Sequence, residues 1–143
     1  DFVLTYEELM GIFEAKEIDF ASLPASEPLA QATSAGRGFA QAGGVAAAVE
    51  EIIRREHPDF EVKTQRADGL RECRKLLMLA KAGKFDGYLL EGMACPGGCI
   101  AGAGTVISSD AAAKKLQQHM AEAEIQSSVD SPYADLADQL NEP

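Results

Sequence analysis

The sequence predicts an α/β fold with a small, mainly parallel sheet flanked by helices. The first observation is that helical and strand-like patterns alternate through the middle of the chain. The second is that a short apolar run, which follows a turn, leads into a Gly-rich loop with two cysteines. The third is the length of 143 residues, which fits one domain rather than two.

The amino-terminal part is expected to begin with a helix and to continue as loop. Thr5 is followed three residues later by Glu8, a capping-box pattern that predicts a helix ending near Lys16. Residues 18–28 contain two prolines and two serines and predict a loop. Residues 33–38 hold Thr, Ser and two glycines, so they predict a second flexible stretch.

The middle of the chain predicts a strong helix and a first strand. Gly43 and Gly44 open a helical pattern over residues 45–55, whose apolar positions fall on one face. Pro58 ends this helix, because proline cannot continue the hydrogen-bonding pattern. Residues 60–64 alternate between apolar and polar side chains and predict a strand.

The rest of the chain predicts two helices, a strand and a loop between them. We expect a helix over residues 70–81, a buried strand over 85–90, a Gly-rich loop over 95–104 and a helix over 111–123. A last helical stretch is predicted over residues 133–140. The predicted apolar face of the first of these helices consists of Leu70, Cys73, Leu77 and Ala80.

The charge balance and the cysteine count narrow the class of protein. Thirteen basic and 23 acidic residues give a formal charge of −10, which argues against nucleic-acid or membrane partners, because phosphate binding needs clustered cations. No apolar run approaches the length of a membrane span. Three cysteines without a secretion signal predict a cytoplasmic location. Since residue 1 is not Met, we expect a piece of a longer protein.

The stretch that carries chemistry is the loop with Cys95 and Cys99, directly after the predicted strand. Pro96 restricts φ, and Gly97 and Gly98 remove side chains from the bend, so that backbone can approach a bulky group. On spacing alone, three interpretations stay open: a metal or iron–sulfur site, a redox disulfide, or a glycine turn with two buried thiols. A zinc site would need four ligands, and the sequence offers no second pair.

The full string from Met93 to Cys99, Met-Ala-Cys-Pro-Gly-Gly-Cys, resembles the last cysteine motif of the iron-only hydrogenase catalytic domain. Phe39, four residues before Gly43-Gly44-Val45, is similar to the family's Phe-x-x-x-Gly-Gly-Val segment beside the active cluster. Residues 4–20 resemble the stretch after the family's second cysteine motif. The resemblance covers most of residues 1–105.

The resemblance implies a cofactor and roles for individual residues. In this family four cysteines hold a cubane 4Fe–4S cluster, and one of them bridges to a di-iron subcluster that carries CO and cyanide. Cys95 would be a cubane ligand, and Cys99 would be the ligand shared with the di-iron unit. No catalytic residue is implied beyond these ligands. The other implied cofactor-binding residues are Phe39, Gly43, Gly44, Met93, Gly97 and Gly98.

The resemblance also implies a function, partners and a domain organisation. Residues 1–125 would form the C-terminal lobe of the catalytic domain, and residues 126–143 an acidic tail or linker. The parent enzyme would interconvert H2 with protons and electrons, using a ferredoxin-like carrier or attached iron–sulfur domains. The family's two upstream cysteine motifs are absent from this sequence. We therefore expect the chain to need the N-terminal lobe, and to be inactive alone with an incomplete or absent cluster.

Several alternatives remain. Residues 101–105, Ala-Gly-Ala-Gly-Thr, replace the family's common Gly-Gly-Gly-Gln-Pro tract, which suggests a divergent, sensory branch. The second hypothesis is a non-catalytic hydrogenase-like iron–sulfur protein, either an assembly or an H2-sensing module. The third is an α/β lobe whose two thiols are empty or disulfide-linked. Glu91 is interpreted as a structural carboxylate rather than a proton relay, and Arg37 as an exposed loop residue rather than an anion contact.

Overall fold

A computed structural model describes residues 2–24 and 31–136 of the chain. The helices and strands alternate in the middle of the chain, as the sequence predicts. The α-helices are α1 (Tyr6–Ala15), α2 (Ser34–Arg37), α3 (Gly44–Glu56), α4 (Leu70–Lys81) and α5 (Ser109–Ala121), and the strands are β1 (Lys63–Asp68) and β2 (Tyr88–Met93). Short 3-10 helices cover Phe20–Ser22, Gly38–Ala40, Cys99–Ala101 and Ser128–Asp130. None of the helices in these described ranges is long and apolar enough to cross a membrane.

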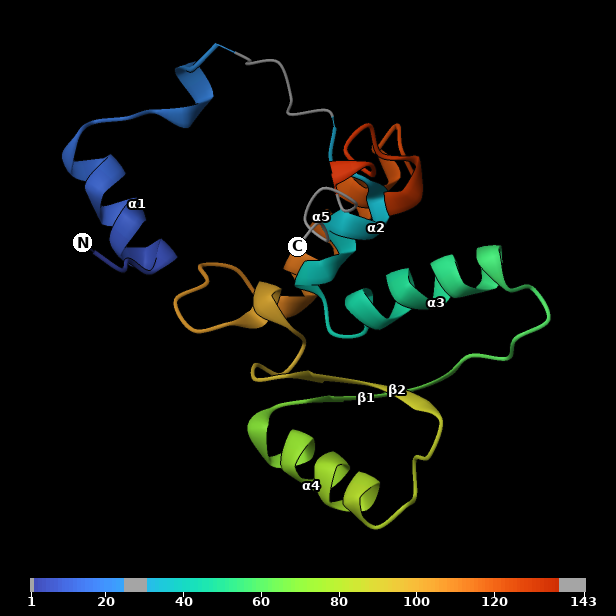
Figure 1. Cartoon of the computed structure of the whole chain (residues 1–143). Coiled ribbons are helices and arrows are strands. Elements are labelled where there is room, and N and C mark those ends of the chain that lie inside the picture. Colours follow the sequence, from blue (N-terminus) through green and yellow to red (C-terminus); the bar gives the residue numbers. More distant parts are fainter. Residues whose placement is uncertain (1, 25–30, 137–143) are drawn as a thin grey trace.

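The sheet consists of β1 and β2, which pair in parallel with α4 as the crossover between them. The register runs from Lys63 opposite Tyr88 to Asp68 opposite Met93, so both strands end at the same edge. In Figure 1, α3 lies on one side of this strand pair and α4 on the other. The predicted class, a small parallel sheet flanked by helices, is therefore confirmed.

The predicted strand boundaries were wrong by about three residues. The first strand was expected over residues 60–64, and the second over 85–90, yet both begin later. Gly87 has a φ of 75°, which no strand residue adopts, so β2 can begin only at Tyr88. Because β1 has β2 as its partner, it begins at Lys63, the residue paired with Tyr88. The shift moves the polar side chains of Arg66 and Asp68 into the strand.

Helix α4 has the predicted bounds but buries a different face. Leu70 and Leu77, which were expected in the core, are 74% and 64% exposed. Leu76 is 7% exposed, and Cys73 and Ala80 are half-buried. The buried positions at 73, 76 and 80 follow the helical spacing of three to four residues. The face toward the sheet is thus rotated by about one position from the predicted one.

Residues 33–38 were predicted to be flexible. This prediction was wrong, because they form α2 and the start of the Gly38–Ala40 turn. The Oγ1 atom of Thr33, itself buried, accepts a hydrogen bond of 2.9 Å from the Gly36 amide and caps the helix. The amides of Ser34 and Ala35 donate to the carbonyls of residues 125 and 126. Those bonds come from a distant part of the chain, which a local pattern does not reveal.

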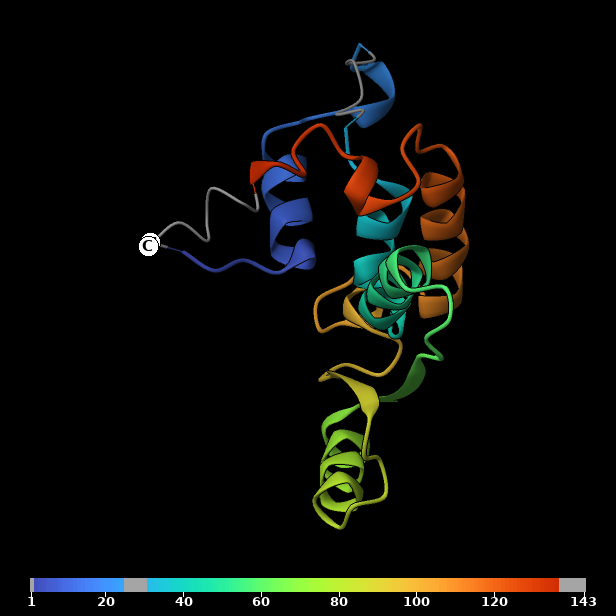
Figure 2. The ribbon, with the colours of Figure 1, turned by 45° about the vertical axis from the view of Figure 1, so that its right-hand side comes forward.

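Residues 2–24 form an arm that stands away from the rest of the molecule in two views (Figures 1 and 2). The predicted capping box is present: the Thr5 hydroxyl accepts from the Glu8 amide, and the Glu8 carboxylate accepts from the Thr5 amide at 2.7 Å. The latter bond lowers the pKa of Glu8. Helix α1 buries none of its residues. Its stability therefore depends on local interactions more than on packing.

The main body is built from α2, α3 and α5, which lie together above the sheet (Figure 2). Its most buried side chains are small. Ala46 and Ala48 of α3 are each 6% exposed, and Ala123 is 5% exposed. Alanine lets helices and loops approach closely, but each alanine buries little apolar area. The predicted apolar positions of α3 are half-buried: Val45, Val49, Ile52 and Ile53.

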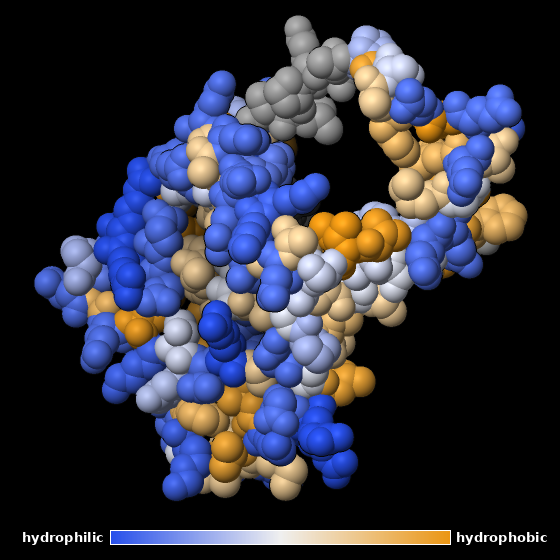
Figure 3. Space-filling model, turned by 180° about the vertical axis from the view of Figure 1, so that it is seen from behind, coloured by the Kyte–Doolittle hydropathy of each residue, from blue (hydrophilic) through white to orange (hydrophobic). Residues whose placement is uncertain are grey.

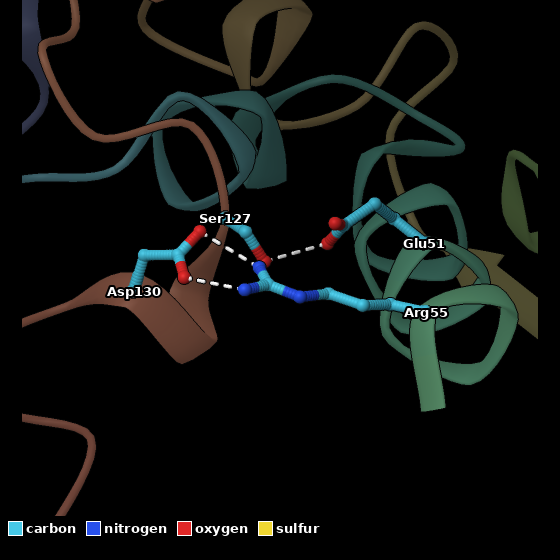
Figure 4. A network of polar contacts seen from close by, with 4 residues as sticks. All are labelled: Glu51, Arg55, Ser127 and Asp130. Atoms are coloured by element: carbon cyan, nitrogen blue, oxygen red, sulfur yellow. Dashed lines mark hydrogen bonds and ion pairs between the residues drawn. The ribbon is translucent and has the colours of Figure 1, made fainter. Parts of the chain in front are cut away.

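The segment after α5 returns to α3 (Figure 4). The buried Ser127 donates a 2.8 Å hydrogen bond to Glu51, and Arg55 makes two bonds of 2.7 and 2.8 Å to Asp130. The predicted domain division at residue 126 stays a prediction. The helix expected over 133–140 lies largely outside the described residues, and Tyr133 to Asp135 form a turn.

Candidate metal centre

The cysteine loop begins directly after β2, at the edge where both strands end. The Gly98 amide donates to the Cys95 carbonyl at 3.0 Å and closes a turn that contains Pro96 and Gly97. Gly97 and Gly98 have φ values of 87° and 95°, so the turn requires residues without a Cβ. Cys99 then opens a 3-10 turn. The sequence correctly places both cysteines on a glycine-bent loop.

Asp68, the last residue of β1, holds this loop from the neighbouring strand. Its carboxylate Oδ2 accepts a hydrogen bond from the amide of Gly97, which lies midway between the two cysteines. The Gly69 amide donates to the Met93 carbonyl at 2.8 Å and joins the same two strand ends. Asp68 was not among the site residues predicted from the sequence. The available signal was an acidic residue before Gly69 at the end of a strand.

The two segments that carry the family resemblance lie against each other. Gln41 and Gly98 form an antiparallel bridge, and the Ala42 amide donates to the Gly97 carbonyl at 3.2 Å. Gly98 is buried here, and a Cβ on it would lie 2.5 Å from the Ala42 nitrogen. Only glycine fits at this contact. The structure thus brings the start of α3 next to the cysteine loop.

Gly43 and Gly44 allow the chain to turn tightly into α3. Gly43 has a φ of 92°. A Cβ on Gly44 would lie 1.9 Å from the carbonyl oxygen of Gly38, so any other residue would push the two segments apart. Arg66 of β1 covers this turn, with its guanidinium 3.4 Å from the Ala42 carbonyl oxygen. These glycines therefore make the close approach between α2 and α3 possible.

Glu91 of β2 caps the start of α3. Its two carboxylate oxygens accept from the amides of Gly43 at 2.6 Å and Ala46 at 2.8 Å. The first residues of a helix have amides without helical partners, and a negative charge there also complements the helix dipole. Gly43, the N-cap residue, has no side chain to do this. The interpretation of Glu91 as a structural carboxylate agrees with this geometry.

The three cysteines are free thiols with different surroundings. Cys99 is exposed and Cys95 is half-buried. Cys73 is half-buried on α4, where its Sγ donates to the carbonyls of Ala67 at 3.4 Å and Met93 at 3.3 Å. Cys73 thus joins α4 to both strands of the sheet.

Phe39 and Met93, the two large apolar residues that the resemblance implies, differ in exposure. Phe39 follows α2 and is 45% exposed, whereas Met93 is half-buried at the end of β2. A cavity of about 280 Å³ lies beside Cys99, between the arm and α5. Its lining is mainly apolar and consists of Tyr6, Ala40, Cys99, Ile100, Thr105, Val106, Ile107 and Ala112.

Arg37 is not an exposed loop residue, so that expectation was wrong. It lies in the last turn of α2 and is half-buried. Its guanidinium donates to the His119 carbonyl near the end of α5 and lies 3.3 Å from the His119 ring. A cation at a helix C-terminus is favourable because the last carbonyls lack helical partners. Arg37 therefore links α2 to α5.

The residues of the loop fit a metal group that is bound by thiolates, but they supply only part of its ligands. Cys95 and Cys99 offer two soft ligands on a loop whose glycines leave space around them. A Cβ on Gly102 would lie 3.6 Å from the Cys95 sulfur and would fill part of that space. Over the described ranges 2–24 and 31–136, the structure has no group of three or more Cys, His, Asp or Glu side chains that could hold a metal ion. Further ligands would have to come from elsewhere.

Fold and loop together define a class: an α/β lobe with two free cysteines on the loop at the carboxyl edge of a parallel strand pair. Residues 1–103 match the family described as iron only hydrogenase large subunit, C-terminal domain, and the chain belongs to this family. It is similar to "NADP-reducing hydrogenase subunit HndD" of Solidesulfovibrio fructosivorans, with 33% identity over 73% of this chain. The match covers 23% of that relative, so the chain spans about a quarter of its length.

Proposed function

We propose that the protein carrying this chain interconverts H2 with protons and electrons, and that the chain supplies the last two cysteine ligands of its cluster. The main observation that supports this proposal is the contact between the cysteine loop and the Phe39–Gly44 segment through Gln41 and Gly98. The family match over residues 1–103 supports the same assignment. When bound, the 4Fe–4S cluster and its di-iron subcluster supply the redox chemistry, while the protein binds and orients them.

In this proposal each loop residue has a distinct task. Cys95 would hold the cubane, and Cys99 would be the ligand that the cubane shares with the di-iron unit. Gly97 and Gly98 hold the bend with positive φ values and add no side chain between the two cysteines. Met93 and Phe39 exclude water next to the cluster, and Gly43 and Gly44 keep the opposing backbone close.

The remaining ligands and the electron partner lie outside this chain in our proposal. Two thiols cannot complete the ligation of a cubane, so an N-terminal lobe of the same cytoplasmic protein would supply the other two. Electrons would arrive from a ferredoxin-like carrier or from attached iron–sulfur domains. The related subunit is named as NADP-reducing, which is compatible with such an electron route.

The ligand assignment is tested in the full-length protein after anaerobic reconstitution with iron and sulfide. We expect Cys95→Ser and Cys99→Ser to lower cluster content and H2 turnover strongly. Cys73→Ser is the matched control, because that thiol bonds to carbonyls of the sheet, and it should retain both. Full cluster content in both loop variants would contradict the assignment.

A second measurement separates catalysis from a binding role. We expect the isolated chain to show no H2 turnover after reconstitution, and robust turnover would contradict the half-site model. If the full-length protein binds the cubane but turns over no H2, the alternative of an assembly or H2-sensing module is correct. If no iron is bound at all, the loop is a thiol-bearing turn without a cluster.

A further inference from the structure

Asp68 is a half-buried carboxylate next to the cysteine loop, and the proposed function gives it no role. It ends β1, whereas the loop follows β2, so it holds the loop from outside the loop's own strand. Its oxygen accepts the amide hydrogen of Gly97. Gly97 is two residues from each cysteine, so its Cα lies within about 7.6 Å of both cysteine Cα atoms along the chain.

The amides between the two cysteines are all accounted for in the described part of the chain. Pro96 has no amide hydrogen. The Gly97 amide donates to Asp68, and the Gly98 amide donates to the Cys95 carbonyl at 3.0 Å. In iron–sulfur sites such amides commonly donate to sulfur and tune the reduction potential. Here the Gly97 amide is directed toward a carboxylate instead.

Asp68 also belongs to a continuous set of contacts around the site. From Asp68 the contacts pass to Gly97, from the Gly97 carbonyl to the Ala42 amide, and from neighbouring Gly43 to Glu91. Glu91 lies on β2, opposite Arg66 of β1, which closes the set through the sheet. Within this set, Asp68 is the residue whose side chain contacts the cysteine loop. Its removal would release the loop on that side.

We propose that Asp68 is a positioning residue of the cluster site, which holds the cysteine loop by the Gly97 amide and withholds that amide from the cluster sulfurs. The inference rests on the proposed function, because it assigns Asp68 a role toward the cluster. It has two consequences. Loss of the side chain loosens the loop, and it also raises the reduction potential of the cluster. The potential rises because a negative charge is lost and an amide is freed to donate to sulfur, and both changes favour the reduced cluster.

The first consequence is tested on this chain without any cluster, by amide hydrogen exchange of Gly97. In Asp68→Ala we expect exchange to be faster by about tenfold, which corresponds to loss of a hydrogen bond worth about 1.4 kcal/mol. Asp68→Asn keeps an oxygen acceptor and should stay near the wild-type rate. Asp59→Ala removes an exposed carboxylate outside the site and is the control. Unchanged exchange in a folded Asp68→Ala chain would overturn the loop-holding role.

The second consequence is tested in the reconstituted full-length protein by redox titration of the cubane. We expect the midpoint potential to rise in the order wild type, Asp68→Asn, Asp68→Ala, because the asparagine removes only the charge. Asp68→Asn should keep its iron content, which separates tuning from loss of the cluster. Equal potentials in all three proteins would overturn the tuning role. A wild-type protein without iron would instead contradict the proposed function, and the Gly97 exchange rates would then decide the loop-holding role alone.

Discussion

Glu91 illustrates how one side chain connects three parts of the molecule. It lies on β2, both of its oxygens bond to amides at the start of α3, and four residues later the chain reaches Cys95. This carboxylate therefore helps to orient the helix toward the cysteine loop, together with the contact between Ala42 and Gly97. Cys73 shows the opposite case at the residue scale. It is a thiol whose hydrogen bonds to the Ala67 and Met93 carbonyls join one helix to the sheet.

Removal of the Glu91 carboxylate should destabilise the chain. In Glu91→Ala the amides of Gly43 and Ala46 lose their partners, so we expect a loss of about 1–3 kcal/mol in the free energy of unfolding. Glu91→Gln should lose less, because its amide oxygen can still accept. The measurement is urea unfolding followed by circular dichroism. Glu61→Ala, at an exposed position, is the control, and an equal loss in both variants would contradict the capping role.

At the scale of elements, α4 and the segment after α5 are held in different ways. Helix α4 attaches to the sheet by a narrow face around Leu76, and its other apolar side chains face outward. The segment that contains Ser127 and Asp130 attaches to α3 by polar contacts (Figure 4). Apolar burial is insensitive to pH, whereas an ion pair depends on it. The two attachments therefore call for different tests.

Two neighbouring leucines on α4 should respond very differently to truncation. Leu76 is 7% exposed and Leu77 is 64% exposed. We expect Leu76→Ala to cost about 2–3 kcal/mol, toward the low end for a core leucine because the core here is thin. Leu77→Ala should change stability by less than about 0.5 kcal/mol. Chemical denaturation of the two variants measures this, and equal costs would show that α4 packs by a different face.

The contact between Arg55 and Asp130 predicts a pH dependence. The Arg55 guanidinium donates to the Asp130 carboxylate and lowers the pKa of that carboxyl. A group whose folded pKa is lowered contributes stability above its ordinary value, and this contribution is lost as the pH falls through the folded value. A carbon-13 NMR titration should place the Asp130 midpoint below the ordinary range. In Arg55→Met the midpoint should return upward, and an unchanged midpoint would contradict the pairing.

At the scale of the whole molecule, the chain exposes more surface than a compact protein of its size. Its accessible surface is 11068 Å², whereas a compact monomer of 15.2 kDa exposes roughly 7,100 Å². Apolar surface gathers over α4 and where the arm joins the body (Figure 3). Large exposed apolar patches on soluble proteins commonly mark interaction sites. This surface supports the proposal that an N-terminal lobe covers parts of the chain.

The exposed apolar surface predicts a difference between the isolated chain and the full-length protein. We expect the chain alone to bind the dye ANS with strong fluorescence, because Leu77, Met78 and Phe60 are each about 60% exposed. Per molecule, the full-length protein should bind several-fold less if an N-terminal lobe covers these side chains. Fluorescence titration at equal molar concentration measures this. Equal dye binding would show that these surfaces remain open in the larger protein.

Sequence patterns that span only a few residues were sufficient to predict much of the fold. The Thr5 and Glu8 pair correctly predicted the cap of α1, and the pattern over residues 70–81 predicted α4 with its bounds. The cysteine motif identified the family, which the match over residues 1–103 confirms. The cap and the helix depend on side chains a few residues apart in the chain, and the motif is a string of consecutive residues, so a single sequence carries them.

The sequence by itself determined the alternation of helices and strands, the glycine-bent cysteine loop and the family of the protein. Only the tertiary structure decided that Asp68 holds that loop, that Arg37 links two helices, and that Ser34–Arg37 form α2. It also set where β1 begins, because the strand starts opposite its partner. The physical reason is common to all four. Each depends on a hydrogen bond to a residue distant in the chain, and local spacing does not encode such a partner.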